Sequence, residues 1–176
     1  MPTATALATD PIEQAWEALA MLTDPEIPVV TLRELGILRD VRTGAQGLEV
    51  IITPTYNGCP AIQQIEDDVR AALAHAGIDA QVVTQLAPAW TTDWMTPAAH
   101  DKLRAYGIAP PHACDTQAAS TGNVVHLRKR FAPVTVACPQ CGSDNTTETS
   151  HFGSTACKAL YRCLDCMEPF DYFKPH

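Results

Sequence analysis

Two pairs of cysteines, each with two residues between its members, constrain the C-terminal quarter of this chain more than any other feature. The pairs are Cys138 with Cys141 and Cys163 with Cys166. Two thiolates three positions apart can bind one metal ion, and backbone N–H groups of such a turn stabilise their charge. Gly142 directly follows the first pair and supplies the backbone freedom that these turns often use. The spacing therefore predicts a four-cysteine metal ribbon over residues 124–176.

Four thiolates with no open coordination position are typical of a structural zinc ion rather than a catalytic metal. A domain of roughly 50 residues is near the size at which a metal ion or disulfides become necessary for folding. A rubredoxin-like iron, an iron–sulfur cluster and two disulfides remain alternatives on spacing alone. Cys157 and Cys114 fit neither pair, and seven cysteines are an odd number for a disulfide framework. We expect one structural Zn²⁺, with Cys157 and Cys114 as idle or buried thiols.

The net charge of −8 lies entirely in the first part of the chain. Residues 1–110 carry 14 acidic and 6 basic side chains, whereas residues 111–176 carry 6 of each. Such a body lacks the positive patch needed to bind phosphate backbones or anionic lipid, and the one basic run is residues 128–130. The first ten residues have no signal-peptide pattern, and no 18 apolar residues are consecutive. We therefore expect a cytoplasmic protein that binds neither nucleic acid nor membrane.

Hydrophobic periodicity predicts a small α+β domain in residues 1–110, followed by a linker at 111–123 and an all-β ribbon. In order, the first domain should contain a helix at 11–22, a hairpin of strands at 38–42 and 48–53, a helix at 61–76, a strand at 81–86 and a helix at 97–107. Asp10 with Pro11, and Thr96 with Pro97, are the start signals of the first and last helices. The ribbon should contain short strands at 134–136, 146–152, 159–162 and 170–173.

Cys59 is the single cysteine of the first domain and lies on the loop before the second predicted helix. The dipole and N–H groups of a helix start favour a thiolate, so we expect its pKa to lie below the ordinary value of about 8.5. A small buried side chain that fills a turn explains the position equally well. Asp24 and Glu26, in the turn after the first helix, either lie beside Cys59 or simply solvate a loop. No nucleophile–base–orienter arrangement of the Ser-His-Asp or Cys-His-Asn kind can be assembled from the sequence.

Three short motifs resemble the domain that the bacterial factor SufT shares with the cytosolic iron–sulfur assembly proteins. They are Asp24-Pro-Glu26-Ile-Pro28, Leu35-Gly36-Ile37, and Thr53-Pro-Thr55 leading to Cys59-Pro60. Together with Pro88-Ala-Trp90-Thr, Met95 and the C-terminal ribbon, they make the chain similar to the PaaD (PaaJ) family, which belongs to the phenylacetyl-CoA epoxidase system. This resemblance implies a role beside a multicomponent oxygenase of aerobic phenylacetate catabolism and aromatic degradation, in which other subunits carry out the redox chemistry.

The resemblance further implies a non-catalytic accessory subunit that matures or repairs the iron–sulfur cluster of the flavin-containing reductase subunit. Cys59, Asp24 and Glu26 map onto the iron–sulfur handling positions, with a transient iron ion or cluster as cargo. Two alternatives stay open: a structural subunit whose ribbon bridges reductase and oxygenase, and a rubredoxin-like electron carrier. The sequence also leaves a homodimer open. The charge-balanced ribbon, with Phe170, Tyr172 and Phe173 near its end, is the expected docking surface for partner proteins.

Overall fold

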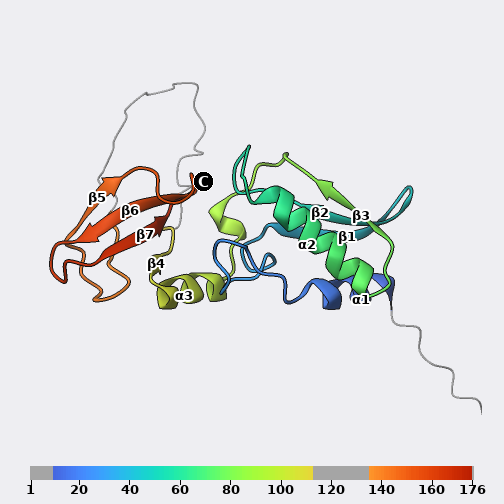
Figure 1. The fold of residues 1–176 in the computed structure, drawn as a ribbon, viewed down its shortest axis with the longest axis horizontal. Coiled ribbons are helices and arrows are strands. Elements are labelled where there is room, and N and C mark those ends of the chain that lie inside the picture. Colours follow the sequence, from blue (N-terminus) through green and yellow to red (C-terminus); the bar gives the residue numbers. More distant parts are fainter. Residues whose placement is uncertain (1–9, 113–134, 176) are drawn as a thin grey trace, which may run out of the picture. The chain divides into compact units, whose positions relative to one another are not determined.

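The computed structural model describes residues 10–112 and 135–175 (Figure 1). These residues divide into two compact units with the boundary after Trp90. The basic run at 128–130, Cys114, Val134 and most of the predicted linker lie outside the described residues. No helix in the described part of the chain is both long enough and apolar enough to cross a bilayer.

The first unit is a three-stranded sheet with two helices. Its elements are α1 (Pro11–Leu19), β1 (Leu38–Gly44), β2 (Gly47–Ile52), α2 (Ile62–His75) and β3 (Ala80–Thr84). The strand order is β1-β2-β3, with β1 antiparallel and β3 parallel to β2. The predicted hairpin is therefore confirmed, and α2 is the crossover that a parallel β2–β3 pair requires. This arrangement confirms the predicted α+β class.

Local hydrogen bonds account for where α1 begins and ends. The Asp10 carboxylate accepts the Ile12 N–H at 2.9 Å, and Pro11 occupies the first helical position of α1. The predicted end of this helix at residue 22 is wrong by three residues. The Ala20 N–H bonds the carbonyl of Glu17, which tightens and ends the last turn.

The core of the first unit includes β2 and one face of α2. Val50, Ile51 and Ile52 are at most 3% exposed, and three side chains of the predicted apolar face of α2 are equally buried. These are Ile65, Val69 and Leu73, spaced by four residues. Strand β2 continues directly into Thr53 and Thr55, which are buried and lead into the loop that carries Cys59.

The segment between α1 and β1 is irregular but extensively hydrogen-bonded. The Thr31 hydroxyl and the Glu34 carboxylate exchange bonds with each other's backbone N–H groups, in the manner of a helix capping box. The Trp90 indole N–H donates to the Leu35 carbonyl at 3.0 Å, which ties the end of the unit to this segment. The sequence did not predict either contact.

The second unit combines a helix with a four-stranded sheet. Its elements are η1 (Thr92–Trp94), α3 (Pro97–Tyr106), β4 (Ile108–Ala109), β5 (Thr146–Ser150), β6 (Lys158–Cys163) and β7 (Pro169–Phe173). The order is β4-β7-β6-β5, with β4 parallel to β7 and the other pairs antiparallel. The N-cap Thr96 and the left-handed Gly107 bound α3 as the sequence predicts.

The two-residue strand β4 is a feature that sequence periodicity did not reveal. Because β4 pairs with β7, residues 91–112 fall in the second compact unit, whereas the sequence assigned residues up to 110 to the first domain. Residues 135–136 form no strand, although one was predicted at 134–136, yet Val136 is buried.

The ribbon core consists of side chains from β4, β6 and β7 together with Val136 and Cys138. Its members are Ala109, Val136, Cys138, Ala159, Tyr161, Cys163, Phe170 and Tyr172. Phe170, Tyr172 and Phe173 are at most 4% exposed, so the expectation that these rings contribute to a docking surface is wrong, and docking through the ribbon stays a prediction. Strand alternation places Phe170 and Tyr172 on one face of the sheet and Phe173 on the other, and all three are buried. The exposed apolar side chains near the second cysteine pair are Leu164 and Met167 instead.

Candidate functional site

The four paired cysteines converge at one point of the second unit. All four sulfur atoms lie within 4.8 Å of one another, with 3.8 Å between Cys138 and Cys166 and 3.6 Å between Cys141 and Cys163. A tetrahedral ion with metal–sulfur bonds of about 2.3 Å separates its sulfurs by about 3.8 Å. A disulfide would need about 2.05 Å. The arrangement therefore fits a four-coordinate metal and does not fit two disulfides.

The two cysteine pairs have the same backbone geometry. The Cys138 N–H donates to the Ser143 carbonyl at 2.9 Å, and the Cys163 N–H donates to the equivalent Glu168 carbonyl at 3.0 Å. The residue after each pair is left-handed, with φ of 74° at Gly142 and 67° at Met167. The first pair thus has the predicted glycine, whereas the second holds a methionine in a conformation that glycine adopts more easily.

The electrostatics of the four thiols indicate that they need a cation. The N–H groups of Cys166 and Asp165 lower the pKa of the Cys163 thiol to about 7. The Glu168 N–H favours ionisation of Cys166, but burial and the other three sulfurs raise the pKa of Cys166 to about 12. Four adjacent thiols cannot all ionise unless a bound positive charge offsets their repulsion.

Asp165 joins the two pairs and was not identified from the sequence. Its carboxylate accepts hydrogen bonds from the Ser143 hydroxyl and, at 2.7 Å, from the Asn145 amide. These bonds lower the pKa of Asp165. The Leu164 N–H also donates to the Asn145 carbonyl at 2.8 Å. A sequence search for such bridges would look for an aspartate inside one C-x-x-C pair. It would also look for a serine and an asparagine shortly after the other pair.

Cys157 takes no part in this centre. Its half-buried sulfur lies 3.1 Å from the Thr155 hydroxyl. In the described part of the chain, the four paired cysteines are the single group of three or more metal-ligating side chains within ligand reach of one another.

Cys59 lies where the sequence placed it, between β2 and α2. Its carbonyl accepts the Ile62 N–H at 3.3 Å, and its own N–H donates to the Tyr56 carbonyl at 3.3 Å. Gly58, at φ 88°, allows the chain to turn immediately before it. The side chain is half-buried at the start of α2.

The expected depression of the Cys59 pKa is wrong. Burial raises the pKa of the thiol, and the carboxylates of Asp24 and Glu26 raise it further. The N–H groups of Ala61 and Ile62 act in the predicted direction but do not outweigh burial. At neutral pH the thiol is therefore protonated.

The structure brings Asp24 and Glu26 close enough to Cys59 for their charges to act on its sulfur. The Asp24 carboxylate accepts the backbone N–H groups of Glu26 at 2.8 Å and Ile27 at 3.0 Å, which fixes the Asp-Pro-Glu turn. One thiol and two carboxylates are ligands that iron accepts. They do not meet within ligand reach of a single point, so a bound ion would have to draw them together.

Two family models match this chain, one for each predicted domain. Residues 12–84 match the family described as iron–sulfur cluster assembly protein. Residues 124–174 match the family described as PaaD zinc beta ribbon domain.

A full-length relative is similar to almost the whole chain. It is a protein of Escherichia coli (strain K12) named as one subunit of a "Putative 1,2-phenylacetyl-CoA epoxidase". The two sequences are 48% identical over 171 residues, which cover 96% of this chain and 95% of the relative.

Solved structures are similar to part of the chain. One is a DUF59 domain from Bacillus anthracis with 26% identity and a TM-score of 0.48, and the match covers 53% of this chain and 91% of that one. A Mycobacterium tuberculosis protein associated with [Fe–S] complex assembly and repair has 30% identity, covers 61% of this chain and 98% of its own, and gives a TM-score of 0.32.

Proposed function

The chain belongs to the PaaD family of 1,2-phenylacetyl-CoA epoxidase subunits, and on this premise we propose that it is a non-catalytic maturation factor. Its client is the iron–sulfur flavin reductase subunit of the same cytoplasmic oxygenase system. The protein supplies or repairs the reductase's cluster and takes no part in epoxidation itself.

The observation that carries this proposal is the environment of the Cys59 side chain. A half-buried thiol, with the carboxylates of Asp24 and Glu26 acting on it, lies in a domain that matches an iron–sulfur assembly family. Its raised pKa keeps the thiol protonated until a cation displaces the proton, which suits transient rather than permanent binding of iron or a cluster.

For the ribbon we propose one structural Zn²⁺ held by Cys138, Cys141, Cys163 and Cys166. The spacing of the sulfurs suits a closed tetrahedral site, and Asp165 holds the two pairs together. Metal analysis of protein purified without air should give about one zinc per chain. Stoichiometric iron with visible absorption would instead support the rubredoxin-like carrier.

The maturation role is tested by producing the reductase together with the wild-type chain, with Cys59→Ser, or with Cys157→Ser as the matched control. Cys59→Ser should retain the fold and the zinc but lower the iron and acid-labile sulfide per reductase, and with them epoxidation of phenylacetyl-CoA. Cys157→Ser should match the wild type, because Cys157 belongs to the second unit and Cys59 to the first. Equal cluster occupancy in all three preparations would reject the maturation role.

The alternative is a structural subunit that bridges reductase and oxygenase through its ribbon. Leu164 and Met167 favour it, because both are apolar, about half exposed, and belong to the second cysteine turn. Under this reading a Leu164→Ser, Met167→Ser double variant should lose binding to the oxygenase complex while Cys59→Ser has no effect. Pull-down with both variants therefore separates the two functions.

A further inference from the structure

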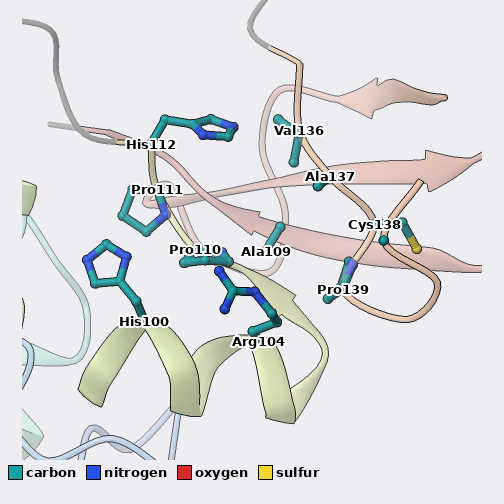
Figure 2. A pocket seen from close by; sticks show the side chains of 11 residues that line it. His100, Arg104, Ala109, Pro110, Pro111, His112, Val136, Ala137, Cys138 and Pro139 are labelled. Carbon is teal, nitrogen blue, oxygen red and sulfur yellow. The ribbon is translucent and has the colours of Figure 1, made fainter. Parts of the chain in front are cut away.

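A cavity of about 420 Å³ lies in the second unit between α3, β4 and the first cysteine pair (Figure 2). Its volume is in the range of small-molecule sites, roughly 300–1,000 Å³. One cysteine of the metal centre, Cys138, borders the cavity, and none of its lining residues belongs to the loop that carries Cys59.

The lining of this cavity carries positive charge and imidazole rings but no carboxylate. His100, Arg104 and His112 line it, in a chain whose net charge is −8. His100 and Arg104 are four residues apart on α3 and therefore share one face of the helix. Figure 2 shows both side chains rising from α3 toward Pro110 and Pro111, with His112 beyond these prolines.

The guanidinium of Arg104 is available to an incoming ligand. Its ion pair with Asp101 is 3.4 Å long, and the two side chains are 57% and 78% exposed. Such exposed pairs are weak and exchange readily with other partners. Burial and the nearby Arg104 charge lower the pKa of His100, so this ring is neutral at pH 7 and offers one N–H donor.

The remaining walls are apolar and conformationally restricted. They include Pro110, Pro111, Pro139 and Val136. Cys138 also borders the cavity, but it is 2% exposed, and Figure 2 shows its sulfur directed away from Arg104. The Cys138 sulfur is therefore directed away from Arg104, and the lining keeps the guanidinium and imidazole donors for an anion.

We propose that this cavity binds the phosphate group of a small phosphate monoester, independently of the maturation role. A guanidinium binds phosphate through two parallel N–H bonds, and the imidazole N–H groups supply further donors. The Arg104 guanidinium and the His100 N–H, on one face of α3, suit a doubly charged group with three terminal oxygens better than a singly charged carboxylate with two. The proline-rich walls would contact the organic part of the ligand.

Phenyl phosphate is a suitable probe, titrated into the ¹⁵N-labelled, zinc-loaded full chain at pH 7. We expect saturable shifts of the Ala109, Ala137 and Gly142 N–H signals, which border the cavity. Arg104→Gln should weaken binding at least tenfold. Lys102→Gln, the charge-matched control on the same helix, should bind like the wild type.

A second variant separates loss of the site from loss of folding. Ala137→Leu adds volume from the opposite wall without changing charge, and it should abolish binding while zinc content stays at one per chain. Three outcomes would overturn the proposal: no saturable shifts at millimolar phenyl phosphate, equal weakening by Arg104→Gln and Lys102→Gln, or equally tight binding of benzoate.

Discussion

The two units of this molecule are stabilised in different ways. Among the described residues, nine of the twelve largest fully buried side chains belong to the first unit, and the other three are Leu103, Val136 and Phe173. In the ribbon, two of the core side chains, Cys138 and Cys163, are themselves proposed metal ligands. The first unit therefore depends on the apolar area it buries, whereas the ribbon, under the proposed function, depends on a bound metal ion.

The largest expected effect is the loss of one metal ligand. Cys138→Ser should remove the metal and unfold the ribbon, because zinc binding to such sites contributes on the order of 10 kcal/mol. The first unit should stay folded, and NMR spectra should show dispersed signals for residues 10–90 alone. Cys157→Ser, the control, should keep both the metal and the full spectrum. A fully dispersed ribbon spectrum in metal-free Cys138→Ser would contradict the contrast between the units.

The converse change deletes apolar volume from the first unit. Leu73 is 2% exposed on α2, and Leu73→Ala should lower the free energy of unfolding of this unit by about 3 kcal/mol. Zinc content should remain unchanged. Ala71→Ser, on the exposed side of the same helix, should have little effect. Denaturant unfolding followed by NMR measures both units at once, and loss of zinc from Leu73→Ala would show that the units are coupled.

A smaller effect distinguishes the two cysteine turns. Met167 is left-handed and 52% exposed, so Met167→Gly should stabilise the ribbon by about 1 kcal/mol. Gly142→Ala should destabilise it by about the same amount, because a Cβ there meets no atom within 4 Å and the cost is confined to the backbone. In competition with a chelator, Met167→Gly should bind zinc more tightly than the wild type, and Gly142→Ala should bind it less tightly. The reverse order would show that contacts of the Met167 side chain contribute more than the strain of its left-handed backbone costs.

Sequence reasoning succeeded where one local signal decides the structure. The cap residues of α1 and α3, the apolar face of α2 and the glycine-bounded hairpin each act within a few residues. The four cysteines converge as predicted, and the spacing within each pair lets its two thiolates reach one ion.

Sequence reasoning failed where distant segments or opposing effects decide. Strand β4 has two residues and exists because β7 pairs with it, and the bonds of Asp165 to Ser143 and Asn145 join turns about 20 residues apart. The aromatic residues of β7 were expected at the surface but are buried. The pKa of Cys59 is set mainly by burial, which the sequence does not reveal, and not by the N–H groups at the start of α2.

The smallest expected effect concerns the one thiol of the first unit. The charge of Asp24 raises the pKa of Cys59, so Asp24→Asn should lower that pKa and increase the thiolate fraction at a given pH. The rate of Cys59 alkylation by iodoacetamide at pH 8, followed by mass spectrometry, should rise severalfold. Asparagine keeps the side-chain oxygen that accepts the Glu26 and Ile27 N–H groups, so the turn should persist. Glu26→Gln should act in the same direction but less strongly.

Asp79→Asn provides the control, because it removes an exposed carboxylate of the same unit that does not shift the pKa of Cys59. An unchanged or slower alkylation rate in Asp24→Asn would show that this carboxylate does not act on the sulfur. Asp24 would then no longer belong to the proposed iron–sulfur site around Cys59. A faster rate would sharpen the contrast between the units. Under the proposed function, N–H groups and a bound cation would hold the ribbon sulfurs as thiolates permanently, whereas burial and two carboxylates would keep the Cys59 thiol protonated until a cation arrives.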